Sequence, residues 1–217
     1  RFMDDLERRG LLDRAVEFLP SQQQLVEREQ RRQPLTRAEL GVLLAYAKIV
    51  LFDELVASDL PDDPHFETDL FGYFPDQMDE PYRAEIEGHR LRREIIATRL
   101  ANDAINRGGP TFVSRLRDLT GRTPHEIVGA FAAARDGFDL DALYGEIDAL
   151  DGKLDGELQL SLYRRVARLL EAVTAWTLKN ETQLPGIADG VASLRTARDG
   201  LEPQLVGLLP AFLQESA

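Results

Sequence analysis

The stretch from Pro81 to Arg107 constrains the fold more than any other part of the sequence. Acidic residues precede it, and Gly108-Gly109-Pro110 follows it, where Gly can take a left-handed cap and Pro cannot continue a helix. We therefore predict one helix of about seven turns over residues 81–107, far longer than the average of about 11–12 residues. At about 100° per residue its apolar side chains fall on two opposite arcs. One arc holds Tyr82, Ile86, Ile96 and Leu100, and the other holds Leu91, Ile95 and Ile105. A surface helix has one apolar stripe, so we expect this helix to be packed between others.

Polar residues interrupt both arcs. His89 and Arg93 share the first arc and Asn102 lies in the second, with Asn106 one turn further on. A buried arginine needs a partner, and two kinds of partner remain open: a structural carboxylate or an anionic ligand. We interpret His89, Arg93, Asn102 and Asn106 as a structural polar cluster, in which the two asparagines bridge to the backbone of a neighbouring helix.

An acidic connector leads into the long helix. Residues 59–80 hold eight Asp or Glu and no Lys or Arg, whereas residues 81–107 hold six arginines and four acids. Phenylalanines and leucines are interleaved with the acids, which indicates a segment held against the core. We therefore expect the connector and the helix to neutralise each other within one fold; a cation site and a partner surface are the alternatives.

The rest of the chain also has helical patterns. Capping boxes, in which two residues at a helix start bond each other's backbone N–H groups, are predicted at Thr36 with Glu39 and at Thr123 with Glu126. A further short helix is predicted over Leu12–Leu19. No alternating β pattern and no fixed-period repeat occurs. We predict an all-α fold, an irregular bundle of roughly ten helices around two long central helices (81–107 and 158–180). Residues 1–217 form a single helical domain in this prediction, with a possible internal break near 108–110.

Composition and motifs exclude several functions. A net charge of -12 argues against nucleic acid or an anionic membrane surface as the main partner. There is no cysteine, and the longest apolar run, Val42–Ala47, is too short for a membrane span. His125-Glu126 begins like a zinc-protease motif, but Gly129 stands where the second histidine is needed. No glycine-rich phosphate loop is present, so we assign no catalytic, cofactor-binding or metal-binding residue.

An ordered set of stretches over roughly residues 2–180 resembles the C-terminal helical region of the large bacterial NAD-specific glutamate dehydrogenases. The stretches are FMDDLERRGLLDRAVEFLPS (2–21), LTRAELGVLLAYAK (35–48), SDLPDD (58–63), YFP (73–75), HRLRREIIATRLAND (89–103), NRGGPTFVSRL (106–116), IDALD (147–151) and WTLKN (176–180). Ala38-Glu39 departs from the Pro-Glu expected after Leu-Thr-Arg, at a helix turn where Pro is replaceable.

The resemblance implies a parent enzyme that oxidatively deaminates L-glutamate to 2-oxoglutarate and ammonium and reduces NAD. Its catalytic lysines and dinucleotide-binding fold are implied to lie upstream. The sequence begins with Arg1 rather than Met, so we expect a fragment of a longer chain. The fragment is then the non-catalytic C-terminal part of a cytoplasmic enzyme, with no cofactor of its own. Its implied partners are its own catalytic domain and the other subunits of a homo-oligomer.

Three functional hypotheses follow. The first is a structural and interaction domain that supports the catalytic domain or the assembly of subunits. The second is a regulatory module that binds an anionic effector or an amino acid near Arg93. The third is a helical adaptor or enzyme unrelated to glutamate metabolism.

Overall fold

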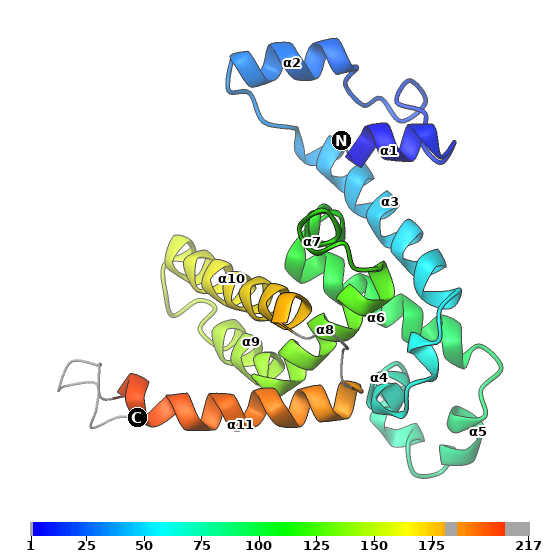
Figure 1. Ribbon diagram of the computed structural model, residues 1–217, viewed down its shortest axis with the longest axis vertical. Helices are drawn as coiled ribbons and strands as arrows, with labels where there is room; N and C mark the ends of the chain where they lie inside the picture. Colours follow the sequence, from blue (N-terminus) through cyan, green and yellow to red (C-terminus); the bar gives the residue numbers. More distant parts are fainter. Residues whose placement is uncertain (1, 181–185, 207–217) are drawn as a thin grey trace.

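The structure is a computed structural model that describes residues 2–180 and 186–206 (Figure 1). These residues form eleven α-helices, three short 3-10 helices and no strand, which confirms the prediction of an all-α fold. The helices are α1 (Phe2–Arg8), α2 (Gln22–Gln30), α3 (Arg37–Val56), η1 (Leu60–Asp62), η2 (Pro64–Phe66), α4 (Glu67–Phe71), η3 (Asp76–Met78), α5 (Arg83–Glu87), α6 (Arg92–Gly108), α7 (Phe112–Thr120), α8 (Pro124–Gly137), α9 (Leu140–Asp148), α10 (Gly156–Asn180) and α11 (Ile187–Val206).

Helix α8 lies at the centre of the main apolar core. Every residue from Ile127 to Ala134 is buried, and α6, α7, α9, α10 and α11 all pack against it (Figure 1). Small residues allow this close packing. A Cβ at Gly129 would lie 3.0 Å from Ile187 of α11, and one at Gly137 would lie 2.7 Å from Leu194. The sequence of α8 is thus matched to neighbours on all sides, which explains why no polar residue occurs from Ile127 to Ala134.

The predicted helix over 81–107 is wrong as a single element. Helix α5 ends at Glu87, and α6 begins only at Arg92. Gly88 caps α5, and the His89 ring nitrogen Nδ1 accepts a hydrogen bond from the backbone N–H of Leu91 at 3.1 Å. Glycine has a low helix propensity, and a side chain that captures a nearby backbone donor competes with the helix. The chain therefore turns between the two helices.

The break also changes the buried face. Tyr82 and Leu91, expected in the two arcs, are both about half exposed. Helix α6 instead buries one broad face in which alanines adjoin the larger side chains: Ile95, Ile96, Ala97, Leu100, Ala101, Ala104 and Ile105. This face packs against α3, α4, α7 and α8, so α6 does lie between other helices as expected.

The N-terminal part forms a second, smaller apolar cluster. Leu6 of α1 and Leu12 and Leu19 of the following loop pack against Leu43 and Val50 of α3. The predicted helix over 12–19 is wrong, because that segment is a series of turns. The Asp13 carboxylate accepts the backbone N–H of Ala15 at 2.8 Å, which draws the chain into a turn. Helix α3 also contributes Ala47, Leu51 and Leu55 to the main core, so this one helix joins both clusters.

The two capping boxes are confirmed. Thr36 accepts from the Glu39 N–H at 3.2 Å, and Glu39 accepts from the Thr36 N–H at 2.7 Å. Thr123 and Glu126 form the same arrangement at the start of α8. Helix α6 ends at Gly108, within the predicted break near 108–110. Gly109 follows with a φ of 85°, a backbone conformation that glycine adopts more readily than other residues.

Two glycine substitutions test the packing of α8 on α11. Gly137→Ala is expected to lower the free energy of unfolding by about 1–3 kcal/mol, because the added methyl group meets Leu194 Cβ at 2.7 Å and Val191 O at 3.3 Å. Gly145→Ala, in the open face of α9 with nothing within 4 Å, is the matched control. It should raise that free energy by about 0.5–1 kcal/mol through helix propensity. Urea denaturation followed by circular dichroism measures both, and equal effects of the two changes would contradict the packing described.

Candidate functional site

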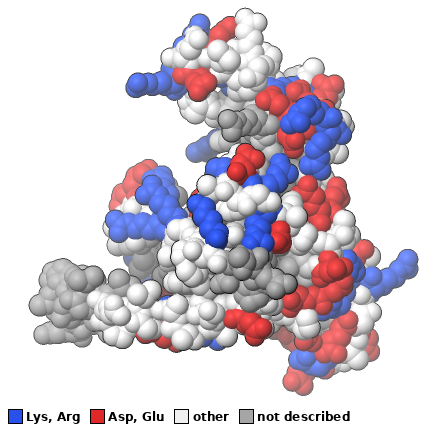
Figure 2. All heavy atoms as spheres, in the orientation of Figure 1, with Lys and Arg blue, Asp and Glu red and all other residues white. Residues whose placement is uncertain are grey.

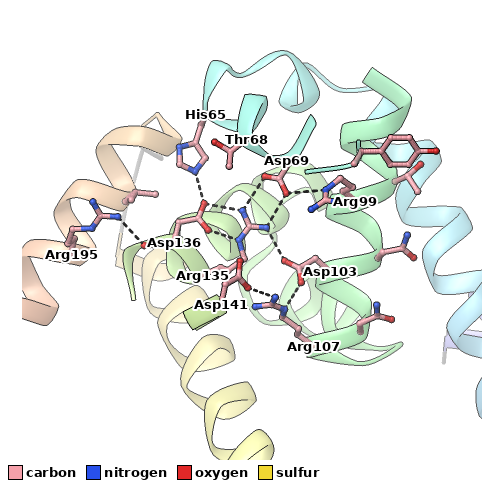
Figure 3. A pocket seen from close by; sticks show the side chains of 15 residues that line it. His65, Thr68, Asp69, Arg99, Asp103, Arg107, Arg135, Asp136, Asp141 and Arg195 are labelled. Carbon is pink, nitrogen blue, oxygen red and sulfur yellow. Dashed lines mark hydrogen bonds and ion pairs between the residues drawn. The ribbon is translucent and has the colours of Figure 1, made fainter. Parts of the chain in front are cut away.

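A buried arginine lies at the end of the central helix. Arg135 of α8 is 6% exposed and faces three carboxylates from three helices (Figure 3). Its Nη2 lies 3.2 Å from Asp69 Oδ2 of α4, its Nη1 lies 3.0 Å from Asp103 Oδ2 of α6, and its Nε lies 2.5 Å from Asp136 Oδ1. A buried charge is tolerated when it is paired and hydrogen-bonded, and this guanidinium is both.

A second layer of charged groups surrounds these four. His65, in η2, lies with its Nε2 2.6 Å from Asp136 Oδ2. Arg107, one turn after Asp103 on α6, pairs with Asp103 and with Asp141 of α9, and its guanidinium lies 4.5 Å from the centre of the Tyr144 ring. Arg99, also on α6, donates to the backbone oxygen of Gly72 at 2.7 Å. We call Arg99, Arg107, Arg135, His65 and the aspartates 69, 103, 136 and 141 the ion-pair network.

Burial and pairing shift the pKa values within this network. Burial alone would lower the pKa of Arg135, but its hydrogen bond to Asp136 and the three nearby aspartates outweigh that effect and raise it. Burial would raise the pKa of Asp136, but the hydrogen bonds from His65 and Arg135 hold it below its usual range. The hydrogen bond to Asp136 raises the pKa of His65. Three arginines and His65 therefore face four aspartates in this network.

Asp103 behaves differently from Asp136. Burial raises the pKa of Asp103, and the neighbouring Arg107 and Arg135 oppose that rise without cancelling it. Two carboxylates of one network are thus shifted in opposite directions, because Asp136 receives hydrogen bonds from both His65 and Arg135.

The network lines a cavity of about 680 Å³ between α4, α6, α8, α9 and α11. Two guanidinium nitrogens in it, Arg99 Nε and Arg107 Nη1, are buried and have no hydrogen-bond partner among the described residues. Arg99 Nε lies 3.9 Å from Asp69 Oδ1, close enough for an ion pair and too far for a hydrogen bond. Such unsatisfied donors are uncommon in folded proteins.

The structure does not bring the four residues of the predicted polar cluster together. Arg93 pairs with Asp62 of the acidic connector and donates to the backbone oxygens of Val56 and Ser58 at 2.9 and 2.8 Å. Its side chain is 38% exposed and does not line the cavity. His89 caps the turn before α6 and packs against the Phe74 ring, with ring centres 5.6 Å apart.

Asn102 and Asn106 lie elsewhere on α6 and line the cavity. Neither makes a side-chain hydrogen bond to a neighbouring helix within the described ranges, so the expected backbone bridges are not seen there. The expected neutralisation of the connector by the arginines is present at Asp62 with Arg93 and at Asp69 with Arg99.

Sequence reasoning missed the centre of the network. The signal was available in the sequence: Arg135-Asp136 directly follows the uncharged run from Ile127 to Ala134, which is far too apolar to face solvent. A charge at the end of such a run needs a partner from another helix. The acidic connector offers many carboxylates, and the sequence alone does not say that Asp69 supplies one of the partners.

Two negative findings apply to the described residues alone. Within 2–180 and 186–206, no group of three or more His, Cys, Asp or Glu side chains is arranged to hold a metal ion. No helix in these ranges is both long and apolar enough to cross a membrane.

The fold and the cavity together define an all-α domain organised around an ion-pair network centred on the buried Arg135. The family model described as "Glutamate dehydrogenase, C-terminal" matches residues 32–217, and the chain belongs to this family.

Relatives named NAD-specific glutamate dehydrogenase match most of the chain. The protein of Halomonas elongata is 42% identical over 208 residues, covering 96% of this chain and 12% of the relative. That of Pseudomonas aeruginosa is 43% identical over 180 residues, covering 83% of this chain and 11% of the relative. That of Mycobacterium tuberculosis is 33% identical over 172 residues, covering 79% of this chain and 10% of the relative. The chain thus spans only 10–12% of the length of each of these relatives.

Replacing the central arginine tests the network. Arg135→Met is expected to lower the free energy of unfolding by about 3–5 kcal/mol at neutral pH, because it removes the buried cation that Asp69, Asp103 and Asp136 share. Arg115→Met, which removes an exposed pair with Glu171 at 2.8 Å, is the control and should cost less than about 1 kcal/mol. Chemical denaturation measures both, and similar losses for the two variants would show that the network does not hold the domain together.

Proposed function

We propose that this chain is the C-terminal helical domain of a larger NAD-specific glutamate dehydrogenase, and that it supports the catalytic domain or the assembly of subunits. One observation carries the proposal: relatives with that name match 79–96% of this chain, while the chain spans only 10–12% of each of them. The family assignment also argues against an adaptor unrelated to glutamate metabolism.

The whole enzyme, in this proposal, converts L-glutamate and NAD to 2-oxoglutarate, ammonium and NADH. The residues that bind NAD and perform the chemistry belong to the part of the polypeptide outside these residues. The charged side chains of the network support this division of labour, because Arg135 and its carboxylates bind one another. The partners are then the catalytic domain and other subunits of a homo-oligomer, in the cytoplasm.

Activity measurements test the assignment. The full-length polypeptide that carries this chain is expected to form NADH from NAD when L-glutamate is supplied. The 217-residue chain alone is expected to form none. Absorbance of NADH follows both reactions.

The same assay, applied to the Arg135→Met variant of the full-length protein, tests whether this domain stabilises the enzyme. In the full-length protein this change should lower the temperature at which activity is lost and leave KM for glutamate within about twofold of the parent value, because the residue acts on stability and not on substrate. NADH formation by the 217-residue chain would place the active site here and contradict the proposal.

A second candidate function, a regulatory module, is favoured by the arginines that line the cavity. Arg93 does not provide an anion site, because Asp62 and two backbone oxygens already engage it. Arg99 and Arg107 line the cavity, and their guanidinium groups could instead donate to a carboxylate there. The surrounding aspartates disfavour a purely anionic ligand. An amino acid suits the cavity better, because its ammonium group can face the exposed Asp141.

Calorimetry on the 217-residue chain tests this second candidate. Under the proposal above, the chain lacks the active site, so any saturable heat from L-glutamate reports a separate site. Arg107→Met should weaken that binding about tenfold, the loss expected for one charge-assisted hydrogen bond. Arg165→Met, on exposed α10, is the control and should leave it unchanged. The regulatory role is ruled out if glutamate, 2-oxoglutarate and nucleotides all give no saturable heat.

A further inference from the structure

Helix α10 carries two apolar stripes, and the second of them is largely exposed in the part of the chain that the structure describes. Val166, Leu170, Thr174 and Leu178 are buried where α10 packs against α8 and its neighbours. Leu158, Leu162, Leu169 and Trp176 form the second stripe, and of these Leu162 packs partly against the main core. Within it Leu158 is 49% exposed, Leu169 39% and Trp176 56%.

The spacing of the exposed stripe is that of a helix-pairing seam. Its members follow one another by four and then seven residues, the spacing of a heptad seam with Arg165 and Ala172 at the remaining positions. Sustained apolar positions with this period indicate packing against another helix, because they return to one face of the helix at every second turn. Trp176 is a residue type that commonly anchors interfaces when it fills a partner's pocket.

The charges within and beside the seam indicate what kind of helix it fits. Arg164, Arg165 and Arg168 are exposed, and none of them makes an ion pair within the described part of the chain. Lys and Arg side chains project from the surface at the position of α10 (Figure 2). They stand out on a chain whose net charge is -12. A second α10 placed against the first would bring arginines close to arginines, which like-charge repulsion disfavours.

We propose that the Leu158–Trp176 seam of α10 binds an acidic amphipathic helix from the part of the parent polypeptide that lies outside these residues. Apolar side chains of that helix cover Leu158, Leu169 and Trp176, and its Asp or Glu residues pair with the three arginines. The inference rests on the proposed function, since the length of the relatives outside the matched region supplies the polypeptide. It identifies the surface through which the domain contacts the rest of the enzyme.

Site-specific cross-linking in the full-length polypeptide tests the proposal. A photoreactive benzoylphenylalanine replaces Leu169 in one variant and Leu160 in the other. The two leucines lie on the same helix and are 39% and 47% exposed, but Leu160 lies off the seam, so it is a matched control. Mass spectrometry identifies the peptide joined to each position. Retained glutamate-dependent NADH formation shows that each variant is folded.

The expected result is a cross-link from position 169 to an acidic helical segment outside residues 1–217, in yield at least about fivefold above position 160. Reversing the three arginines together (Arg164→Glu, Arg165→Glu and Arg168→Glu) should lower that yield about threefold or more, as should high salt. A cross-link to a second copy of this domain, to a segment without acids, or no excess over position 160 would each overturn the proposal.

This experiment separates the two levels of inference. An active full-length enzyme without the expected cross-link contradicts the seam alone. A cross-link in a full-length protein that forms no NADH from glutamate contradicts the proposed activity and leaves the docking surface intact.

Discussion

The packing of this domain depends on one buried guanidinium. Taking the charge of Arg135 out of water carries a large desolvation cost, and only carboxylates placed within hydrogen-bond distance offset it. Those carboxylates come from α4 and α6 as well as from α8 itself. The arginine therefore fixes how three helices lie relative to one another, which apolar packing alone would specify less strictly. The small residues of α8 serve the same end, because they let α11 approach closely. Arg195 of α11 lies beside Asp136 at the edge of the same network (Figure 3).

The sequence predicts the helices well and their breaks poorly. Capping boxes at Thr36 and Thr123 are local, since both partners lie within one turn, and so they are visible in the sequence. The break at Gly88 depends on a side-chain acceptor, His89, whose ring could equally have faced the core. The turns over 12–19 depend on Asp13 and on the salt bridge from Arg14 to Glu7 at 2.9 Å, a contact with another segment. Helical periodicity contains no information about such contacts.

In the candidate site, too, some contacts could be predicted from the sequence and others could not. Arg93 and its connector partner could be anticipated from the concentration of acids in residues 59–80. The choice of Asp69 and Asp103 as partners of Arg135 could not, because these residues are 66 and 32 positions away in the chain. The sequence also does not show whether an arginine on a helix forms an ion pair within the fold. The arginines of α6 are mostly neutralised within the fold, whereas those of α10 remain exposed. Only the three-dimensional arrangement distinguishes the two sets.

Helix α3 has a mechanical consequence. It contributes to the small N-terminal cluster through Leu43 and Val50 and to the main core through Ala47, Leu51 and Leu55. A helix of 20 residues with no proline is a stiff rod of about 30 Å, and stiff rods transmit rotation along their length. A force that tilts the N-terminal cluster is therefore carried directly to α6, against which α3 packs (Figure 1). Helix α6 supplies Arg99, Asp103 and Arg107 to the wall of the charged cavity. A tilt of the N-terminal cluster therefore changes the position of that wall.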